Sequence, residues 1–441
     1  MSEMALALLV HPNGSHPASW LRSDAPKNAS NNIEYYRHLA QTAERGKFDL
    51  FFIADTPAAR TEKLDIYSRW PTFMNVFEPI TLLSAIAGAT NHIGLGATAS
   101  TSFFEPYNLA RQFASLDHIS SGRAAWNVVT SANDYAARNF GLDKLPPHSD
   151  RYVKARECFE VVASLWDTWE EGAFIGDKES GRVFDPAKFH ATDHDGKYFH
   201  VHGGLNIART PQGRPVIIQA GASSEGREFA AETAEVVFAS DGTLPAAQRF
   251  YADLKGRMGK FGRQESELKI LAGLSPIVGS SQAEAEDKYH TLQNLIHPDV
   301  GRMRVGADLE VDLSGLPLDE PIPEHMLPSS SNLHQAYFAQ IVAMIREKKM
   351  TLRQLYTSYE RGKVTVCGTP TQIADHMEQW LRARAADGFM LSLHVLPNDL
   401  DPFVQLVVPE LQRRGLARKD YTGSTLRHNL GLPTPRNRHA S

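Results

Sequence analysis

Amides, hydroxyls and single ionisable groups stand at the ends of short, strongly apolar segments of this chain. The segment AAWNVV, for example, contains Asn127 and is followed by Thr130 and Ser131. Few of these groups are charged, and a site built from them suits a neutral heterocycle that carries a phosphate. The residues at such positions are His11, His16, Asp55, Thr98, Ser100, Thr101, Asn127, Thr130, Ser131, Gln219, Gly221, Ser223, Ser224 and His394.

The stretch QAGASSEG, residues 219–226, is the best candidate for a phosphate site. Gly221 allows the backbone to approach a ligand closely, and Ser223 and Ser224 stand where a helix is expected to begin. A helix N-terminus presents free N–H groups and a positive dipole to an anion. The alternative is that one of the two serines only caps the helix.

The stretch HSDRYVKARECF predicts the start of a long helix. His148 and Tyr152 are four residues apart, so they share one face if the helix begins early. Such a pair either lines a site or only packs against its surroundings. We interpret Cys158, within the same helix, as a small buried core residue rather than a nucleophile.

Several familiar motifs are absent or are explained by structure alone. GLGATA (94–99) has the form of a dinucleotide-binding pattern, but STSFFEP follows it where that motif requires a helix. Thr369 and Gln372 have the spacing of a capping box, with Pro370 at the first helical position. The sequence contains no HExxH, GxSxG or P-loop motif. We therefore expect neither a metal site nor a hydrolase triad.

Apolar segments that read as strands alternate with amphipathic segments that read as helices. Unalternating apolar strands connected through helices are typical of a parallel sheet. The number of such units favours a closed (β/α)8, TIM-like barrel over an open doubly wound sheet. In such a barrel the carboxyl ends of the strands meet at one mouth, so the polar residues above would come together there. The expected strands are 6–10, 49–55, 92–100, 124–129, 215–221, 235–240, 268–279 and 389–397.

Two segments and the C-terminal tail do not fit this repeat. Residues 171–213 are rich in Gly, Asp, Lys and His, and residues 298–335 include PLDEPIPEHMLPSSSN. We expect both to be insertions at the C-terminal face of a single domain, 1–441. They would serve as lids over a site or as tolerated surface loops. The tail, from DYTGST onwards, is expected to be an extended arm that packs on the barrel or on a partner subunit.

The composition is that of an ordinary globular protein, with 42% hydrophobic and 22% charged residues. A formal net charge of -5 argues against nucleic acid or an anionic membrane as a main partner. The apolar run near the N-terminus is too short and too poor in basic residues for a signal peptide, and no run is long enough to span a bilayer. The two distant cysteines, Cys158 and Cys367, indicate a cytoplasmic protein without a disulfide framework.

Taken together, these segments resemble the bacterial luciferase-like flavin monooxygenases. The subgroup with the greatest similarity contains the nitrilotriacetate, EDTA and dibenzothiophene-sulfone monooxygenases. The likeness runs from about residue 30 to the C-terminus, and WNVVTS, the RY that follows it and the later QAGAS are its most specific parts. Other matching stretches are ERGKFDLFFIAD, EPITLLSAIAGAT, EPYNLARQFASLDHISSGR, LWDTWEEGAF, FDPAKFH, CGTPTQIADHM and VVPELQRRG.

The resemblance implies a TIM-like barrel that binds FMN as FMNH2 and uses O2 as co-substrate. The FMNH2 would come by diffusion from a separate NAD(P)H:flavin reductase. The resemblance also implies a homodimer or homotetramer. By matching position, the residues that would line the flavin ring and ribityl chain are Asp55, Thr98, Thr101, Asn127, His148 and Tyr152. Those that would hold the phosphate are Gly221, Ser223 and Ser224.

Other residues bear on catalysis and on the substrate. Family members often have a histidine near the position of His16, so we expect His16 to contact the oxygen adduct or the substrate. His394 stands where relatives have a less polar residue. Three aromatic residues near the mouth favour a partly apolar substrate, unless they only pack a loop on the barrel: Tyr67, Trp70 and Phe73.

The expected activity is that of a two-component FMNH2-dependent monooxygenase. It would oxygenate a small organic substrate and so lead to cleavage of a C–S or C–N bond. Three alternatives stay open at the level of sequence. One is a flavin- or deazaflavin-dependent hydride-transfer oxidoreductase on the same barrel, which would incorporate no oxygen-18 into product. Another is a flavin-binding protein without catalysis, which would show no turnover with any reductase. The third is a structural barrel without a ligand, which would bind no flavin.

Overall fold

The centre of the molecule is a closed barrel of parallel strands. The computed structural model describes residues 3–70, 72–329, 335–360 and 364–440. Strand β11 pairs with β1, and β8 pairs with β9, so the sheet closes on itself. The TIM-like barrel predicted from the sequence is therefore confirmed. In their order around the barrel the strands are β1 (Ala5–Leu9), β2 (Leu50–Ile53), β3 (Gly94–Ser100), β4 (Ala124–Val129), β7 (Val216–Gln219), β8 (Val236–Ala239), β9 (Lys269–Val278) and β11 (Gly388–Leu391).

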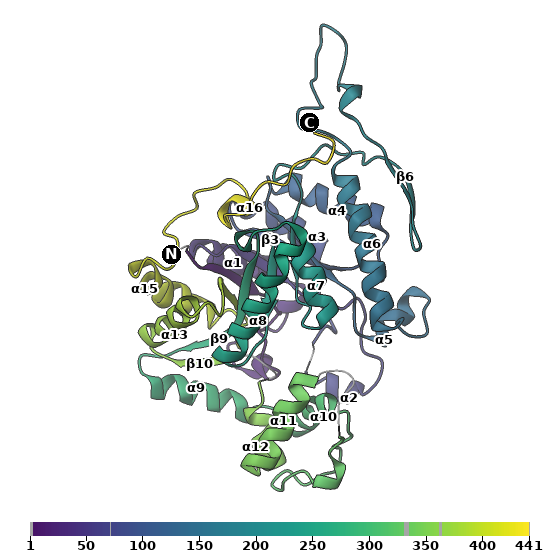
Figure 1. The fold of residues 1–441 in the computed structure, drawn as a ribbon. Helices are drawn as coiled ribbons and strands as arrows, with labels where there is room; N and C mark the ends of the chain where they lie inside the picture. Colours follow the sequence, from purple (N-terminus) through teal and green to yellow (C-terminus); the bar gives the residue numbers. More distant parts are fainter. Residues whose placement is uncertain (1–2, 71, 330–334, 361–363, 441) are drawn as a thin grey trace.

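Helices cover the outside of this barrel (Figure 1). An additional strand, β10 (Val364–Gly368), pairs with the second half of β9. The longer covering helices are α1 (Ile33–Arg45), α3 (Pro79–Ala87), α4 (Pro106–Ile119), α6 (His148–Trp166), α7 (Ser224–Thr233), α8 (Leu244–Arg257), α9 (Gln282–Asn294) and α13 (Pro370–Arg382). The short ones are α2 (Leu64–Tyr67), α5 (Asp134–Ala137), α14 (Leu400–Pro402), α15 (Val408–Arg413) and α16 (Leu426–Asn429).

Side chains alternate along the strands between the barrel interior and the helices outside. Along β1, Ala5 and Ala7 belong to the interior cluster, whereas Leu6 and Leu8 pack in the layer under the helices. A side chain at Gly96 in β3 would lie 3.1 Å from the Phe52 ring. The glycine therefore makes room for its neighbours across the barrel, and the interpretation of GLGATA as a packed strand is confirmed.

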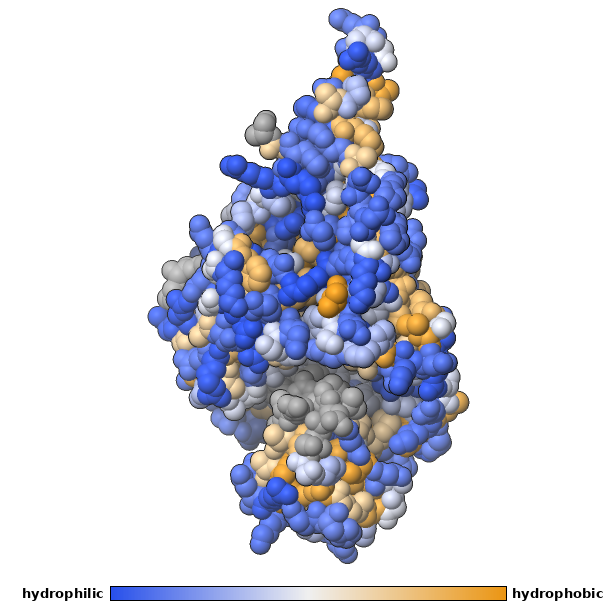
Figure 2. Space-filling model, turned by 45° about the vertical axis from the view of Figure 1, so that its right-hand side comes forward, coloured by the Kyte–Doolittle hydropathy of each residue, from blue (hydrophilic) through white to orange (hydrophobic). Residues whose placement is uncertain are grey.

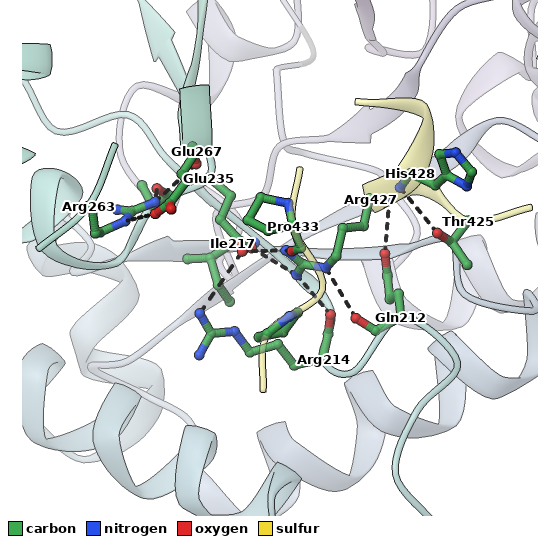
Figure 3. Close-up of polar contacts among 12 residues, drawn as sticks. Gln212, Arg214, Ile217, Glu235, Arg263, Glu267, Thr425, Arg427, His428 and Pro433 are labelled. Carbon is green, nitrogen blue, oxygen red and sulfur yellow. Dashed lines mark hydrogen bonds and ion pairs between the residues drawn. The ribbon is translucent and has the colours of Figure 1, made fainter. Parts of the chain in front are cut away.

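The C-terminal arm closes the N-terminal end of the barrel. Leu426, Leu430 and Leu432 of this arm join the cluster in the barrel interior. The Arg427 guanidinium, only 1% exposed, pairs with the Glu235 carboxylate and donates to the Gln212 carbonyl at 3.1 Å (Figure 3). Buried apolar and ionic contacts thus hold the arm against the barrel.

The segment 171–213 lies at the end of the barrel opposite to the one we expected. It follows α6 and precedes β7. A connection from a helix to the next strand runs along the N-terminal face of a barrel, so the predicted position at the C-terminal face is wrong. The segment carries a hairpin, β5 (Thr192–Asp195) and β6 (His200–Gly203), and projects from the barrel at the top of Figure 1.

The second expected insertion lies at the mouth and is largely helical. After α9 the chain forms α10 (Pro298–Leu309), α11 (Gln335–Lys348) and α12 (Leu352–Ser358), which share a hydrophobic cluster of their own. We call residues 298–358 the helical lobe; its residues 330–334 lie outside the described part of the chain. Figure 1 shows the lobe at the lower end, and in Figure 2 hydrophobic residues gather on it.

The surface elsewhere in Figure 2 is mostly hydrophilic. The projecting segment is an exception, with Val183 66% and Phe174 46% exposed. Among the helices of the described residues, none has the length and apolar character that a membrane span requires.

Candidate active site

Two cavities open at the carboxyl ends of the barrel strands. The first has a volume of about 280 Å³ and lies at the ends of β2, β4 and β7. We call it the Asp55 cavity. The second has a volume of about 390 Å³ and lies beyond the end of β1, under the helical lobe. We call it the His16 cavity. Ala54 lines the second and Asp55 the first, so the two are neighbours at the end of β2.

Three of the predicted cofactor residues line the Asp55 cavity together. Asp55 follows β2, Tyr152 lies on α6, and Gly221 follows β7. Tyr152 and Ser224 also line an adjoining hollow of about 410 Å³ between α6 and α7. These residues are far apart in the sequence. They meet at the mouth because the carboxyl ends of all the parallel strands lie at the same end of the barrel.

Two further predicted residues form a bonded pair inside the barrel. The Asn127 side chain donates to Thr98 Oγ1 at 2.9 Å, and Thr98 Oγ1 donates to the Ile53 carbonyl at 3.0 Å. Both residues are buried, and Asn127 Oδ1 has no donor among the described residues. A buried acceptor without a partner is costly and calls for an explanation. Asn127 itself is not among the residues that line the Asp55 cavity, although Val128 and Val129, which follow it, are.

The backbone around Gly221 is too close to other groups for any side chain. A Cβ at Gly221 would lie 2.9 Å from the Gly226 Cα and 3.1 Å from the Tyr152 hydroxyl. Ser223 caps α7, its Oγ accepting from the Gly226 N–H at 3.1 Å. The interpretation of this serine as a helix cap is confirmed. The same geometry leaves a helix N-terminus beside the Tyr152 hydroxyl, which fits a phosphate.

Thr101 and His148 lie at the margin of this arrangement. Thr101 is fully buried, and its hydroxyl donates to the Val129 carbonyl at 3.1 Å, so it supports the end of β4. His148 is exposed at the start of α6, with its ring 4.8 Å from that of Tyr152. Neither is part of the wall of the Asp55 cavity.

Burial changes the acidity of the carboxyl group in the first cavity. Desolvation, assisted by the charge of Glu78, raises the pKa of Asp55 to about 6. No cation among the described residues lies within ion-pair distance of this carboxyl. Its proton is therefore exchangeable close to neutral pH, a property common in active sites.

His16 lies in the second cavity and is held by two hydrogen bonds. Its Nδ1 accepts from the Ala18 N–H at 3.1 Å, so the proton is on Nε2, which is 3.3 Å from Gln293 Oε1. Burial, followed by the charges of His394 and Arg304, lowers the pKa of His16 to about 3. The imidazole is therefore neutral in the folded protein at physiological pH.

A buried carboxylate that sequence reasoning missed completes this network. Glu360 Oε1 accepts from the Tyr289 hydroxyl at 2.6 Å and from the Gln293 amide at 2.7 Å. Burial alone would raise the pKa of Glu360, but the His394 imidazole, 3.7 Å from its Oε2, and the Tyr289 hydroxyl lower it well below the usual range. No local pattern marks Glu360, because its partners come from α9 and from the end of β11.

The three aromatic residues singled out in the sequence all line the His16 cavity: Tyr67, Trp70 and Phe73. The Phe73 ring lies edge-on to the His11 ring, 5.8 Å between centroids. A further hollow, about 790 Å³, lies between α10 and α5 and adjoins the Asp55 and His16 cavities. It shares Asn133 with the Asp55 cavity and Arg60 with the His16 cavity. The three spaces therefore adjoin one another at the mouth.

The described residues contain no group of three or more His, Cys, Asp or Glu side chains that could hold a metal ion. The polar groups at the mouth include amides and hydroxyls, as the sequence predicted, and also the ionisable side chains of Asp55, Arg60 and Glu360.

Comparison with known proteins bears directly on this site. The family model described as luciferase-like monooxygenase matches residues 14–388. An N-acetyl-S-(2-succino)cysteine monooxygenase of Bacillus subtilis (strain 168) is 46% identical over 442 residues, covering 99% of this chain and 98% of the relative. Component A of the nitrilotriacetate monooxygenase of Aminobacter aminovorans is 45% identical over 444 residues, with the same coverage of 99% and 98%. A solved riboflavin lyase with modified FMN and riboflavin superposes with a TM-score of 0.86 at 30% identity, covering 99% of this chain and 97% of the other.

Proposed function

Because this chain belongs to the luciferase-like monooxygenases, a family of flavin-dependent oxidoreductases, we propose that it oxygenates a small organic substrate with O2 and reduced FMN. The observation that carries the proposal is the convergence of Asp55, Tyr152 and Gly221 on one cavity at the mouth of the barrel. The reaction inserts one oxygen atom into the substrate and reduces the other to water. Cleavage of a C–S or C–N bond would follow.

We assign the flavin to the Asp55 cavity. Asn127 Oδ1 would accept a ring N–H, and its amide stays fixed by the bond to Thr98. Gly221 lets the backbone approach the phosphate, and Ser223 and Ser224 begin α7, whose N-terminal N–H groups would bind it. Bound reduced FMN supplies the electrons that activate O2. The protein's own part is to hold the cofactor, exclude water and orient the substrate.

We assign the substrate to the His16 cavity, which adjoins the flavin at the end of β2. The neutral His16 would present its ring to the reacting region without adding charge there. The helical lobe supplies one wall through α10 and limits the access of water. Asp55, with its raised pKa, can hold or release a proton near the cofactor at neutral pH.

We also propose that a separate NAD(P)H:flavin reductase supplies FMNH2. The designation of the nitrilotriacetate relative as component A supports a system of more than one component. The reduced flavin would then reach the cavity by diffusion.

The test is a substrate screen in 18O2 with FMN, NADH and a generic flavin reductase, using thioethers and tertiary amines as candidate substrates. We expect one oxygen-18 atom in the oxygenated product, detected by mass spectrometry. Oxidation without oxygen-18 would establish hydride transfer instead. Flavin binding without turnover of any candidate would favour a protein that only binds flavin.

A further inference from the structure

We propose that Arg60 forms a binding subsite for a carboxylate group of the substrate. Arg60 lies in the loop after β2. It lines both the His16 cavity and the hollow of about 790 Å³ between α10 and α5. The inference rests on the proposed function, because it names the class of substrate that this site would accept: an organic carboxylate with an apolar or thioether arm.

Two tyrosine rings hold the Arg60 guanidinium in place. Its central carbon lies 4.3 Å from the centroid of the Tyr135 ring and 4.9 Å from that of Tyr67. Stacking on aromatic faces fixes a guanidinium group while leaving the N–H groups at its edge free to donate. The backbone is anchored as well, since the Arg60 N–H donates to the Met74 sulfur at 3.2 Å.

The positive charge of Arg60 has no acidic partner within ion-pair distance among the described residues. Two of the acidic groups on the same walls are engaged with other arginines: Asp299 pairs with Arg302 at 2.9 Å, and Glu62 faces Arg138 at 4.0 Å. Glu360 accepts two hydrogen bonds from Tyr289 and Gln293, as described above. A half-buried cation without a counter-ion is poised for an anion supplied from outside.

The chemistry of the surroundings narrows the choice of anion. A guanidinium edge binds a carboxylate through two parallel hydrogen bonds. The neighbouring walls are aromatic, with Tyr67 and Trp70 stacked 6.4 Å apart, and they suit a hydrocarbon or thioether arm. Arg60 stands five residues after Asp55, so a substrate held by its carboxylate would extend along the mouth towards the flavin cavity.

The experiment uses thiodiglycolate, a thioether with two carboxylates, and its uncharged dimethyl ester. Binding of each is measured by isothermal titration calorimetry to the full-length protein, with and without oxidised FMN. The variants are R60M, R60K and R69M. Arg69 is the matched control, since it is an exposed arginine paired with Asp65 and lies outside the cavity walls.

We expect R60M to bind thiodiglycolate at least tenfold more weakly than the wild type, with R60K between the two and R69M unchanged. The ester should bind R60M and wild type alike. Equal affinity of R60M and wild type for thiodiglycolate, including no binding to either, would overturn the proposal. So would an equal loss for the ester. An FMN titration of the wild type distinguishes failure of the Arg60 proposal from failure of the proposed function. Wild-type protein that binds FMN keeps the flavin assignment even if Arg60 has no effect on thiodiglycolate binding.

Discussion

Two buried carboxyl groups, one at each end of the barrel, respond to burial in opposite ways. At the N-terminal end, burial would raise the pKa of Glu235, but the charges of Arg427 and Arg214 lower it below the usual range. At the mouth, burial raises the pKa of Asp55 to about 6, and no described cation pairs with it. The same desolvation thus produces a stable ion at one end and a titratable group at the other.

The ion pair of Arg427 with Glu235 holds the C-terminal arm against the N-terminal end of the barrel. Asp55 at the mouth has no such partner among the described residues. At the same end, Asn127 Oδ1 has no described donor and the Arg60 guanidinium has no described acidic partner. In barrels of this type the active site lies at the carboxyl ends of the strands, and the opposite face serves stability.

The largest expected effect is on the N-terminal end. R427M leaves the Glu235 carboxylate buried without its main partner, so we expect the free energy of unfolding to fall by about 3–5 kcal/mol. Urea unfolding followed by circular dichroism measures this. R436M is the control, because Arg436 is exposed on the same arm. A loss below about 1 kcal/mol would remove the contrast between the two ends.

A smaller effect is expected on cofactor affinity at the mouth. S223A removes a hydroxyl from the start of α7, and a lost hydrogen bond to the charged phosphate should weaken FMN binding by about 1.5–3 kcal/mol. Fluorescence titration with FMN measures the change. T369A is the matched control, since Thr369 caps α13 in the same way, away from the cavity. If T369A weakened FMN binding as much, Ser223 would act only through helix stability.

The smallest effect concerns the acidity of Asp55. A carboxyl with a raised pKa in the fold opposes folding when it is ionised, so D55N should stabilise the protein by about 1–2 kcal/mol above pH 6. The gain should shrink as pH falls from 6 and vanish below about pH 4, where Asp55 is protonated in both states. Urea unfolding across this pH range, with D143N at an exposed position as control, measures it. A gain that stays constant with pH would contradict the assignment.

Much of the barrel could be predicted because its signals are local. Apolar runs identify the strands, and a polar residue such as Asp55 or Asn127 at the end of a run identifies the mouth. The position of segment 171–213 was also available from chain order, since it follows a helix and precedes a strand. Its composition is typical of a loop that covers a site, but a connection from a helix to the next strand places it at the N-terminal face.

The rest of the site depends on contacts that no local pattern records. Arg60 lies in a loop without periodicity, and its two aromatic partners come from α2 and α5. Glu360 becomes part of the site only because α9 and the end of β11 meet there. Such positions are set by tertiary packing, so the sequence alone gives them no distinguishing mark.

The most direct test of the central claim is an FMN titration of the N127A variant, with N91A as the control. Asn91 is exposed and precedes β3, so it lies at the end of the barrel away from the mouth. If the mouth binds flavin through the unpaired Asn127 carbonyl, N127A should bind FMN at least about tenfold more weakly, or 1.4 kcal/mol, while N91A matches the wild type. Wild-type affinity in N127A would contradict the assignment of the flavin to this end of the barrel.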